Sequence, residues 1–169
     1  MKFIAALLLA AFSLAAPAAS PYKTQNVMLL QPDFVLKDRV QSVEALSNYL
    51  KAAETTAQSA LAKESPVPTS GFIVFAVRPG AQSRVWLDFK PALPEPVATR
   101  LREAIQAIPP FPAKNGTVVF ALNVTLWDAT PRVGFPNPPE WDKAMQGHNE
   151  PMEIGAMVDK LVWPKGAGT

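Results

Sequence analysis

Residues 71–90 read GFIVFAVRPGAQSRVWLDFK, and this stretch decides the fold. Its first part, 71–77, is apolar and rich in β-branched and aromatic side chains, which is typical of a strand covered on both faces. Pro79 and Gly80 then form a turn signal. Residues 83–90 alternate between apolar and polar side chains, which predicts a second strand with one face in water. We therefore expect a β-hairpin whose first strand is central in a sheet.

Helical patterns lie on both sides of this hairpin. Apolar residues three or four positions apart predict a long N-terminal helix over 34–63, with Asp33 as its N-cap. A similar stripe predicts a second helix over 95–108, which Pro109 ends. Residues 117–127 alternate cleanly and predict another strand. The expected fold is α+β: a small antiparallel sheet of three or more strands, in β-β-α-β order, packed with the long N-terminal helix and the second helix.

The composition changes after this last strand. Proline, with 18 residues in the chain, exceeds its average usage of about 5%. Proline is dense over 128–151, which we interpret as a long, partly extended loop. Residues 152–163 fit a short helix, with an edge strand over 160–163 as the alternative. We expect 19–127 to form one α+β domain and 128–169 to be a Pro-rich C-terminal extension that packs on it.

The first 18 residues have the pattern of a cleavable export signal. Lys2 precedes an apolar run over 3–16, and the small residues that follow predict cleavage after Ala18. The run of about 14 residues is shorter than the roughly 20 that a helix needs to cross a bilayer. The sequence therefore predicts a periplasmic or secreted protein with no membrane span after signal cleavage.

Charge and composition exclude several classes of function. The chain has 16 basic and 14 acidic residues, and removal of the signal takes away Lys2 alone, which leaves 15 and 14. Because these charges are interspersed, we expect no nucleic-acid partner. The absence of cysteine excludes disulfides, thiolate zinc sites and cysteine nucleophiles. The sequence has no phosphate loop or dinucleotide fingerprint, and we expect neither a cofactor nor a metal.

The order of elements over 71–127 resembles the C-terminal domain of the TonB family of energy transducers. The matching segments are the strand pair 71–77 and 84–88, the helix 97–108, the proline-aromatic break 110–112 and the strand 117–127. The match covers about a third of the chain and rests on order and pattern. Energy transducers of this family keep an N-terminal membrane anchor and a proline-rich spacer, whereas this chain has a cleavable signal and a helix. The resemblance implies an exposed sheet edge that accepts an extended peptide from an envelope partner.

Aromatic and charged side chains on the polar faces of the predicted strands are the candidate binding residues. They are Trp86, Trp127, Arg84 and Asp88, together with Trp141 in the proline-rich extension. Exposed aromatic rings beside prolines suit a peptide or glycan groove. The alternative, which we favour, is that the extension folds back and buries the tryptophans as a second small core, because large apolar rings on an open face are costly.

Two functions from different classes fit these patterns. The first is a non-enzymatic interaction module that binds an envelope protein or peptide through a sheet edge or the tryptophan-bearing face. The second is a small envelope hydrolase or glycan-binding protein that uses the loop 128–153, with His148, Glu150 and Asp142 as its candidate groups. A single histidine without a Gly-x-Ser-x-Gly elbow favours neither a zinc site nor a Ser-His-Asp triad. We therefore favour the first function and expect no enzyme.

Overall fold

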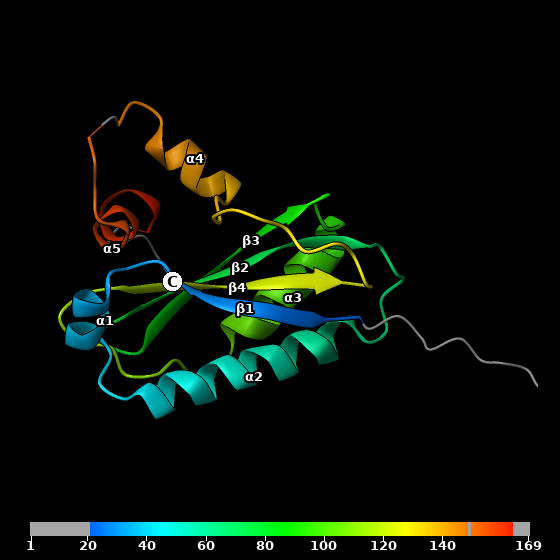
Figure 1. The fold of residues 1–169 in the computed structure, drawn as a ribbon, viewed down its shortest axis with the longest axis horizontal. Coiled ribbons are helices and arrows are strands. Elements are labelled where there is room, and N and C mark those ends of the chain that lie inside the picture. The colour runs from blue at the N-terminus through cyan, green and yellow to red at the C-terminus, as the bar shows by residue number, and fades with distance from the viewer. Residues whose placement is uncertain (1–20, 149, 164–169) are drawn as a thin grey trace, which may run out of the picture.

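The computed structural model describes residues 21–148 and 150–163 of the chain (Figure 1). Four strands form one antiparallel sheet in the order β1-β4-β2-β3. The strands are β1 (Lys23–Leu29), β2 (Thr69–Arg78), β3 (Gln82–Lys90) and β4 (Val118–Leu126). An α+β fold with an antiparallel sheet is thereby confirmed. The predicted export signal over 1–18 lies outside the described residues.

Three helices contribute to one face of the sheet. They are α1 (Asp33–Arg39), α2 (Val43–Leu61) and α3 (Glu95–Gln106). Their buried residues join those of the sheet in a first core cluster, in which Tyr49, Phe75 and Phe120 meet. The Phe75 and Phe120 rings stack with their centroids 5.0 Å apart, and Tyr49 meets Phe75 edge-on at 5.8 Å. Aromatic packing of this kind adds to the apolar burial that holds the helices on the sheet.

The described part of the C-terminal extension, which we call the C-terminal segment, covers the opposite face of the sheet (Figure 1). It contains α4 (Pro139–Met145), α5 (Ile154–Met157) and the π-helical turn η1 (Val158–Val162). Its apolar side chains and those of the sheet form what we call the second cluster. The buried members of the second cluster are Phe72, Val74, Ala76, Trp86, Val119, Ala121, Trp141, Met157 and Val158. Because both faces are covered, every residue of β2 and β4 is buried.

The long helix expected over 34–63 is wrong, because the chain breaks it between α1 and α2. Val40 forms an isolated bridge with Ala113, and the Lys114 N–H donates to the Arg39 carbonyl at 3.0 Å. Ser42 then caps α2 by accepting from the Ala45 N–H at 3.1 Å. The backbone groups that the break leaves without helical partners are therefore hydrogen-bonded elsewhere. Some bind the segment that precedes β4, and one binds the Ser42 side chain.

The proline-rich extension also contains more helix than its composition indicated. The loop expected over 128–151 includes α4, in which Pro138 is the N-cap and Pro139 the first helical residue. Proline suits this position because its missing N–H would be unpaired there in any case. Over 152–163 the short helix is confirmed by α5 and η1, and the alternative edge strand is wrong. Within the described ranges, no helix has the length and apolar character needed to cross a membrane.

Candidate functional site

The two edges of the sheet differ in how far they are open. At the β3 edge, the side-chain amide of Gln106 at the end of α3 binds the strand backbone. Its Oε1 accepts from the Val85 N–H at 2.9 Å, and its Nε2 donates to the Ser83 carbonyl. A single side chain thus replaces a neighbouring strand at the beginning of β3. This edge is blocked there against the addition of another strand.

The β1 edge is open along the end of the strand. The Leu30 N–H donates to the Val119 carbonyl of β4 at 3.3 Å. Hydrogen-bonded and non-bonded pairs alternate along an antiparallel ladder. The backbone of Met28, two residues before Leu30, therefore also faces β4. The N–H and C=O groups of Val27 and Leu29 point away from the sheet. No described residue forms a hydrogen bond with these outward groups. They are available to an incoming strand.

The side chains along this edge are apolar and partly uncovered. Val27 is 43% exposed and Leu29 is 51% exposed. They pair with Leu122 and Phe120 of β4 and so lie on the helix side of the sheet, while Met28 packs against the second cluster. Charged residues and proline usually protect a sheet edge from pairing. Between Thr24 and Leu29 the strand contains neither.

Gln31 marks the end of the open edge. Its Oε1 accepts from the Val119 N–H at 2.9 Å, and its Nε2 donates to the Thr117 carbonyl at 3.1 Å. This is the same arrangement that Gln106 makes at the β3 edge. Beyond Leu30, therefore, the backbone of β4 is paired with a side chain, and the open edge is limited to β1 itself.

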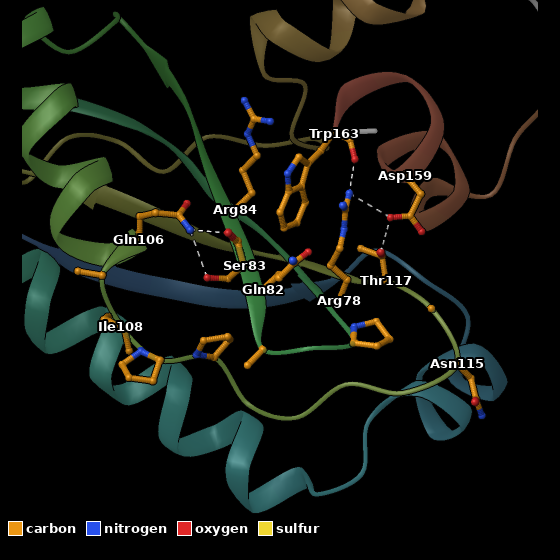
Figure 2. Close-up of a pocket in the computed structure, with 16 residues that line it drawn as sticks. Arg78, Gln82, Ser83, Arg84, Gln106, Ile108, Asn115, Thr117, Asp159 and Trp163 are labelled. Carbon is orange, nitrogen blue, oxygen red and sulfur yellow. Dashed lines mark hydrogen bonds and ion pairs between the residues drawn. The ribbon is translucent and has the colours of Figure 1, made fainter. Parts of the chain in front are cut away.

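A groove of about 1150 Å³ lies at the end of the sheet, between the β2–β3 turn and the segment that follows α3 (Figure 2). Here the Arg78 guanidinium stacks on Trp163, with its central carbon 3.5 Å from the ring centroid. Arg78 also pairs with Asp159 at 3.3 Å and donates to the Trp163 carbonyl. The Thr117 hydroxyl donates to the same Asp159 carboxylate at 2.6 Å. The groove thus holds the polar anchor of η1.

The charged groups in this groove hold η1 against the end of β2. Burial of the Arg78 guanidinium lowers its pKa, Asp159 opposes that effect, and the nearby positive charge of Arg84 adds to it. Arg78 and Asp159 are engaged with each other. The described lining residues contain no histidine or cysteine, and the Asp159 carboxylate that accepts from the Thr117 hydroxyl is paired with Arg78.

The three candidate tryptophans are buried in two different places. Trp86 and Trp141, exposed by 2% and 4%, meet edge-on in the second cluster with ring centroids 5.6 Å apart. Trp127, exposed by 6%, joins the first cluster instead. Strand β4 ends at Leu126, and Trp127 has a positive φ of 50°, so the alternation of the strand no longer applies to it. The rings lie under the C-terminal segment and in the main core, not on an open face.

The two charged candidates also lie in different environments. Arg84 is exposed, and its guanidinium carbon lies 5.7 Å from the centroid of the Trp86 ring. Asp88 is buried and accepts from Arg132 at 2.7 Å and from the Asn137 N–H at 2.8 Å. Asp88 therefore fastens the beginning of the C-terminal extension to β3. The structure does not bring Arg84, Asp88 and the tryptophans together as one surface.

The three candidates for the hydrolase alternative are exposed and separate. Asp142 accepts from the Asn137 amide at 2.7 Å, and the His148 N–H donates to the Met145 carbonyl at 2.9 Å. No hydrogen bond or ion pair joins His148, Glu150 and Asp142 within the described ranges. Nor do residues 21–148 and 150–163 contain a group of three or more His, Cys, Asp or Glu side chains that could hold a metal.

The open β1 edge is the feature that the sequence patterns did not indicate. Comparisons with protein-family models, with curated proteins and with solved structures found no match. The one local signal for the edge strand is the short apolar run of Val27, Met28 and Leu29.

Glu153 fastens the C-terminal segment at the beginning of α5. Its carboxylate accepts from Gln31 and, at 2.9 Å each, from the N–H groups of Gly155 and Ala156, and it lies 3.4 Å from Arg39. Burial alone would raise the pKa of Glu153. The hydrogen bonds and the positive charge of Arg39 together outweigh burial and lower its pKa below the usual 4.5.

Replacing Glu153 by alanine should lower the free energy of unfolding by about 1 kcal/mol at neutral pH, because α5 loses its N-cap. A carboxylate with a lowered folded-state pKa stabilises the fold above its unfolded pKa, and this stabilisation is lost as the pH falls through the folded-state pKa. Urea unfolding across pH should therefore show wild type and variant converging below pH 4.5. The exposed Glu140, replaced by alanine, is the control. A Glu153→Ala difference that stays constant through the acid range would contradict the assignment.

Proposed function

We propose that this chain is an exported, non-enzymatic interaction module that binds an extended segment of an envelope protein or peptide by adding it to β1. The observation that carries the proposal is the outer edge of β1, where the backbone groups of Val27 and Leu29 point outward beside exposed apolar side chains and pair with no described residue. A docked strand would gain main-chain hydrogen bonds from both residues and apolar contact from their side chains.

The position of the edge supports a docked segment of limited length. Strand β1 ends at Leu29, and the Gln31 side chain takes its place beside β4, so an added strand would lose the β1 backbone as its partner beyond Leu29. At its beginning, β1 has a bulge between Thr24 and Asn26, where the register against β4 shifts. Bulges disturb pairing. The docked segment would thus pair mainly along residues 26–29.

Two sequence features support the envelope as the place of action. The export signal predicted over 1–18 would carry the chain out of the cytosol. The order strand, strand, helix, strand over 71–127 is similar to that of the TonB C-terminal domain, for which peptide addition at a sheet edge is the implied mode. In this chain we assign that role to β1, because Gln106 already occupies the beginning of the β3 edge.

Replacing Val27 by proline tests the proposal. Its N–H points outward, so proline removes a donor that a docked strand needs and leaves the β1–β4 ladder intact. A photo-crosslinking side chain at Leu29 should capture a discrete envelope partner from an envelope extract. We expect the Val27→Pro variant to lose at least about nine-tenths of that product while circular dichroism and thermal unfolding stay close to those of wild type.

Two control variants separate edge pairing from other causes. Val133→Pro places the same residue at a site that is 94% exposed and outside the sheet, and it should leave the crosslink unchanged. His148→Ala should also leave it unchanged, because the proposal gives the histidine no role. A folded Val27→Pro protein that crosslinks as strongly as wild type would rule out the β1 edge, and loss on His148→Ala would favour the loop 128–153 instead.

A further inference from the structure

All four methionines within the described residues belong to the second cluster. Met28 comes from β1, Met145 from the end of α4, Met152 from the segment before α5, and Met157 from α5. The first cluster, although larger, contains none within the same ranges. Within residues 21–148 and 150–163, methionine is therefore confined to the contact between the sheet and the C-terminal segment.

Three of these side chains lie at the margin of that contact. Met157 is buried, whereas Met28, Met145 and Met152 are partly exposed. Because the chain has no cysteine, its sulfur chemistry is that of thioethers alone. A thioether within reach of solvent can be oxidised to the sulfoxide, which turns a flexible apolar side chain into a polar one.

The contact that these methionines complete is the one that holds the C-terminal segment on the sheet. Apolar packing in its middle is flanked by ionic anchors, with Arg132 on Asp88 at one end and Asp159 on Arg78 at the other. Three buried polar atoms at the contact, Trp141 Nε1, Asn123 Oδ1 and Arg78 Nε, have no hydrogen-bond partner. Unpaired buried atoms cost free energy, and the apolar packing offsets this cost together with the ionic anchors.

We infer that Met28, Met145 and Met152 are sites of oxidation to methionine sulfoxide, and that their oxidation releases the C-terminal segment from the sheet. The oxidant is a hydroperoxide. A sulfur lone pair attacks the terminal peroxide oxygen, the S–O bond forms as the O–O bond breaks, and water or an alcohol leaves. The sulfur is oxidised by two electrons and the peroxide is reduced by two, and a thiol-dependent sulfoxide reductase reverses the step.

Release follows because the new sulfoxide oxygen would lie among apolar side chains. A sulfoxide is a strong acceptor, and the second cluster offers it mainly carbon; among the described members of the cluster, the one buried N–H donor without a partner is Trp141 Nε1. Each oxidised side chain that stays packed should shift the docking equilibrium toward release by about tenfold. Release uncovers the sheet face formed by Phe72, Val74 and Val119. The first cluster on the other face keeps its packing.

The test treats the full-length protein with hydrogen peroxide and compares it with the triple variant M28L/M145L/M152L. Leucine keeps the apolar volume but cannot be oxidised, and exchange between methionine and leucine is well tolerated in cores. Mass spectrometry of peptides locates the added oxygen. Hydrogen exchange then compares the amides of 154–162 with those of β2, so that local release is distinguished from global unfolding.

We expect oxygen on the three methionines of wild type and at least about tenfold faster exchange over 154–162, with little change in β2. The triple variant treated in the same way should keep its original exchange, and a sulfoxide reductase should restore wild type. Wild type that takes up the oxygen without faster exchange, or that resists oxidation at these sites, would overturn the inference. So would equal acceleration in the triple variant, because the cause would then lie elsewhere.

Discussion

Replacing Gly71 by alanine should lower the free energy of unfolding by about 3 kcal/mol, at the upper end of the usual cost of overpacking. Gly71 lies in the central strand, opposite Phe89 of β3 and Val124 of β4. A Cβ atom there would come within 2.1 Å of the Asp88 carbonyl oxygen and 2.6 Å of the Phe89 Cα. Both are backbone atoms, so no side chain can turn aside to make room. Urea unfolding followed by tryptophan fluorescence measures the change.

Gly80 is the matched control for this effect. It has a positive φ of 89° in the β2–β3 turn, but nothing lies within 4 Å of an added Cβ. Gly80→Ala should therefore cost about 1 kcal/mol through backbone strain alone. If Gly71→Ala proved no more costly than Gly80→Ala, the close approach of β3 to Gly71 would not be what fixes glycine at this position.

The hairpin and its central strand could be predicted because their signals are local. A run of apolar β-branched and aromatic residues, a Pro-Gly turn and a clean alternation all lie within 71–90. The break between α1 and α2 could not be predicted in the same way. Its cause is the bridge between Val40 and Ala113, which are far apart in sequence. The apolar stripe alone therefore predicted one continuous helix.

The environment of Trp86 shows the limit of the alternation rule. Its neighbours Arg84 and Lys90 are exposed on the same strand, yet Trp86 is 2% exposed. The alternation correctly places Trp86 on the face opposite the helices, but whether that face is wet depends on the C-terminal segment. The sequence left burial and exposure as alternatives, because no local pattern states where a proline-rich segment docks.

The candidate site depends on the order of the strands in the sheet, which no local sequence pattern predicts. Lys23–Leu29 has little periodicity, because an edge strand is only partly buried. Its importance follows from the order β1-β4-β2-β3, which puts β1 at an edge, where no described residue pairs with its outer backbone. Likewise, nothing in the sequence indicates that the side chains of Gln31 and Gln106 take the place of a neighbouring strand. Only their contacts with Val119 and Val85 indicate this role.

Replacing Arg132 by alanine should lower the free energy of unfolding by about 3 kcal/mol, because it leaves a buried carboxylate without its cation. The Asp88 side chain is 4% exposed, that of Arg132 is 18% exposed, and the two lie 2.7 Å apart. Without Arg132, Asp88 keeps the Asn137 N–H as a donor. Chemical unfolding measures the cost, and a change in Trp141 fluorescence below the main transition would report that the extension leaves the sheet first.

Arg102 provides the matched control, because it forms an exposed ion pair with Glu95 at 3.6 Å, with the Glu95 side chain 82% exposed. Its replacement by alanine should cost less than about 0.5 kcal/mol. The double variant D88N/R132A should recover part of the loss of R132A alone, because a neutral amide removes the uncompensated charge. If R132A cost no more than R102A, or if D88N failed to relieve it, the Asp88–Arg132 pair would not be what fastens the extension to β3.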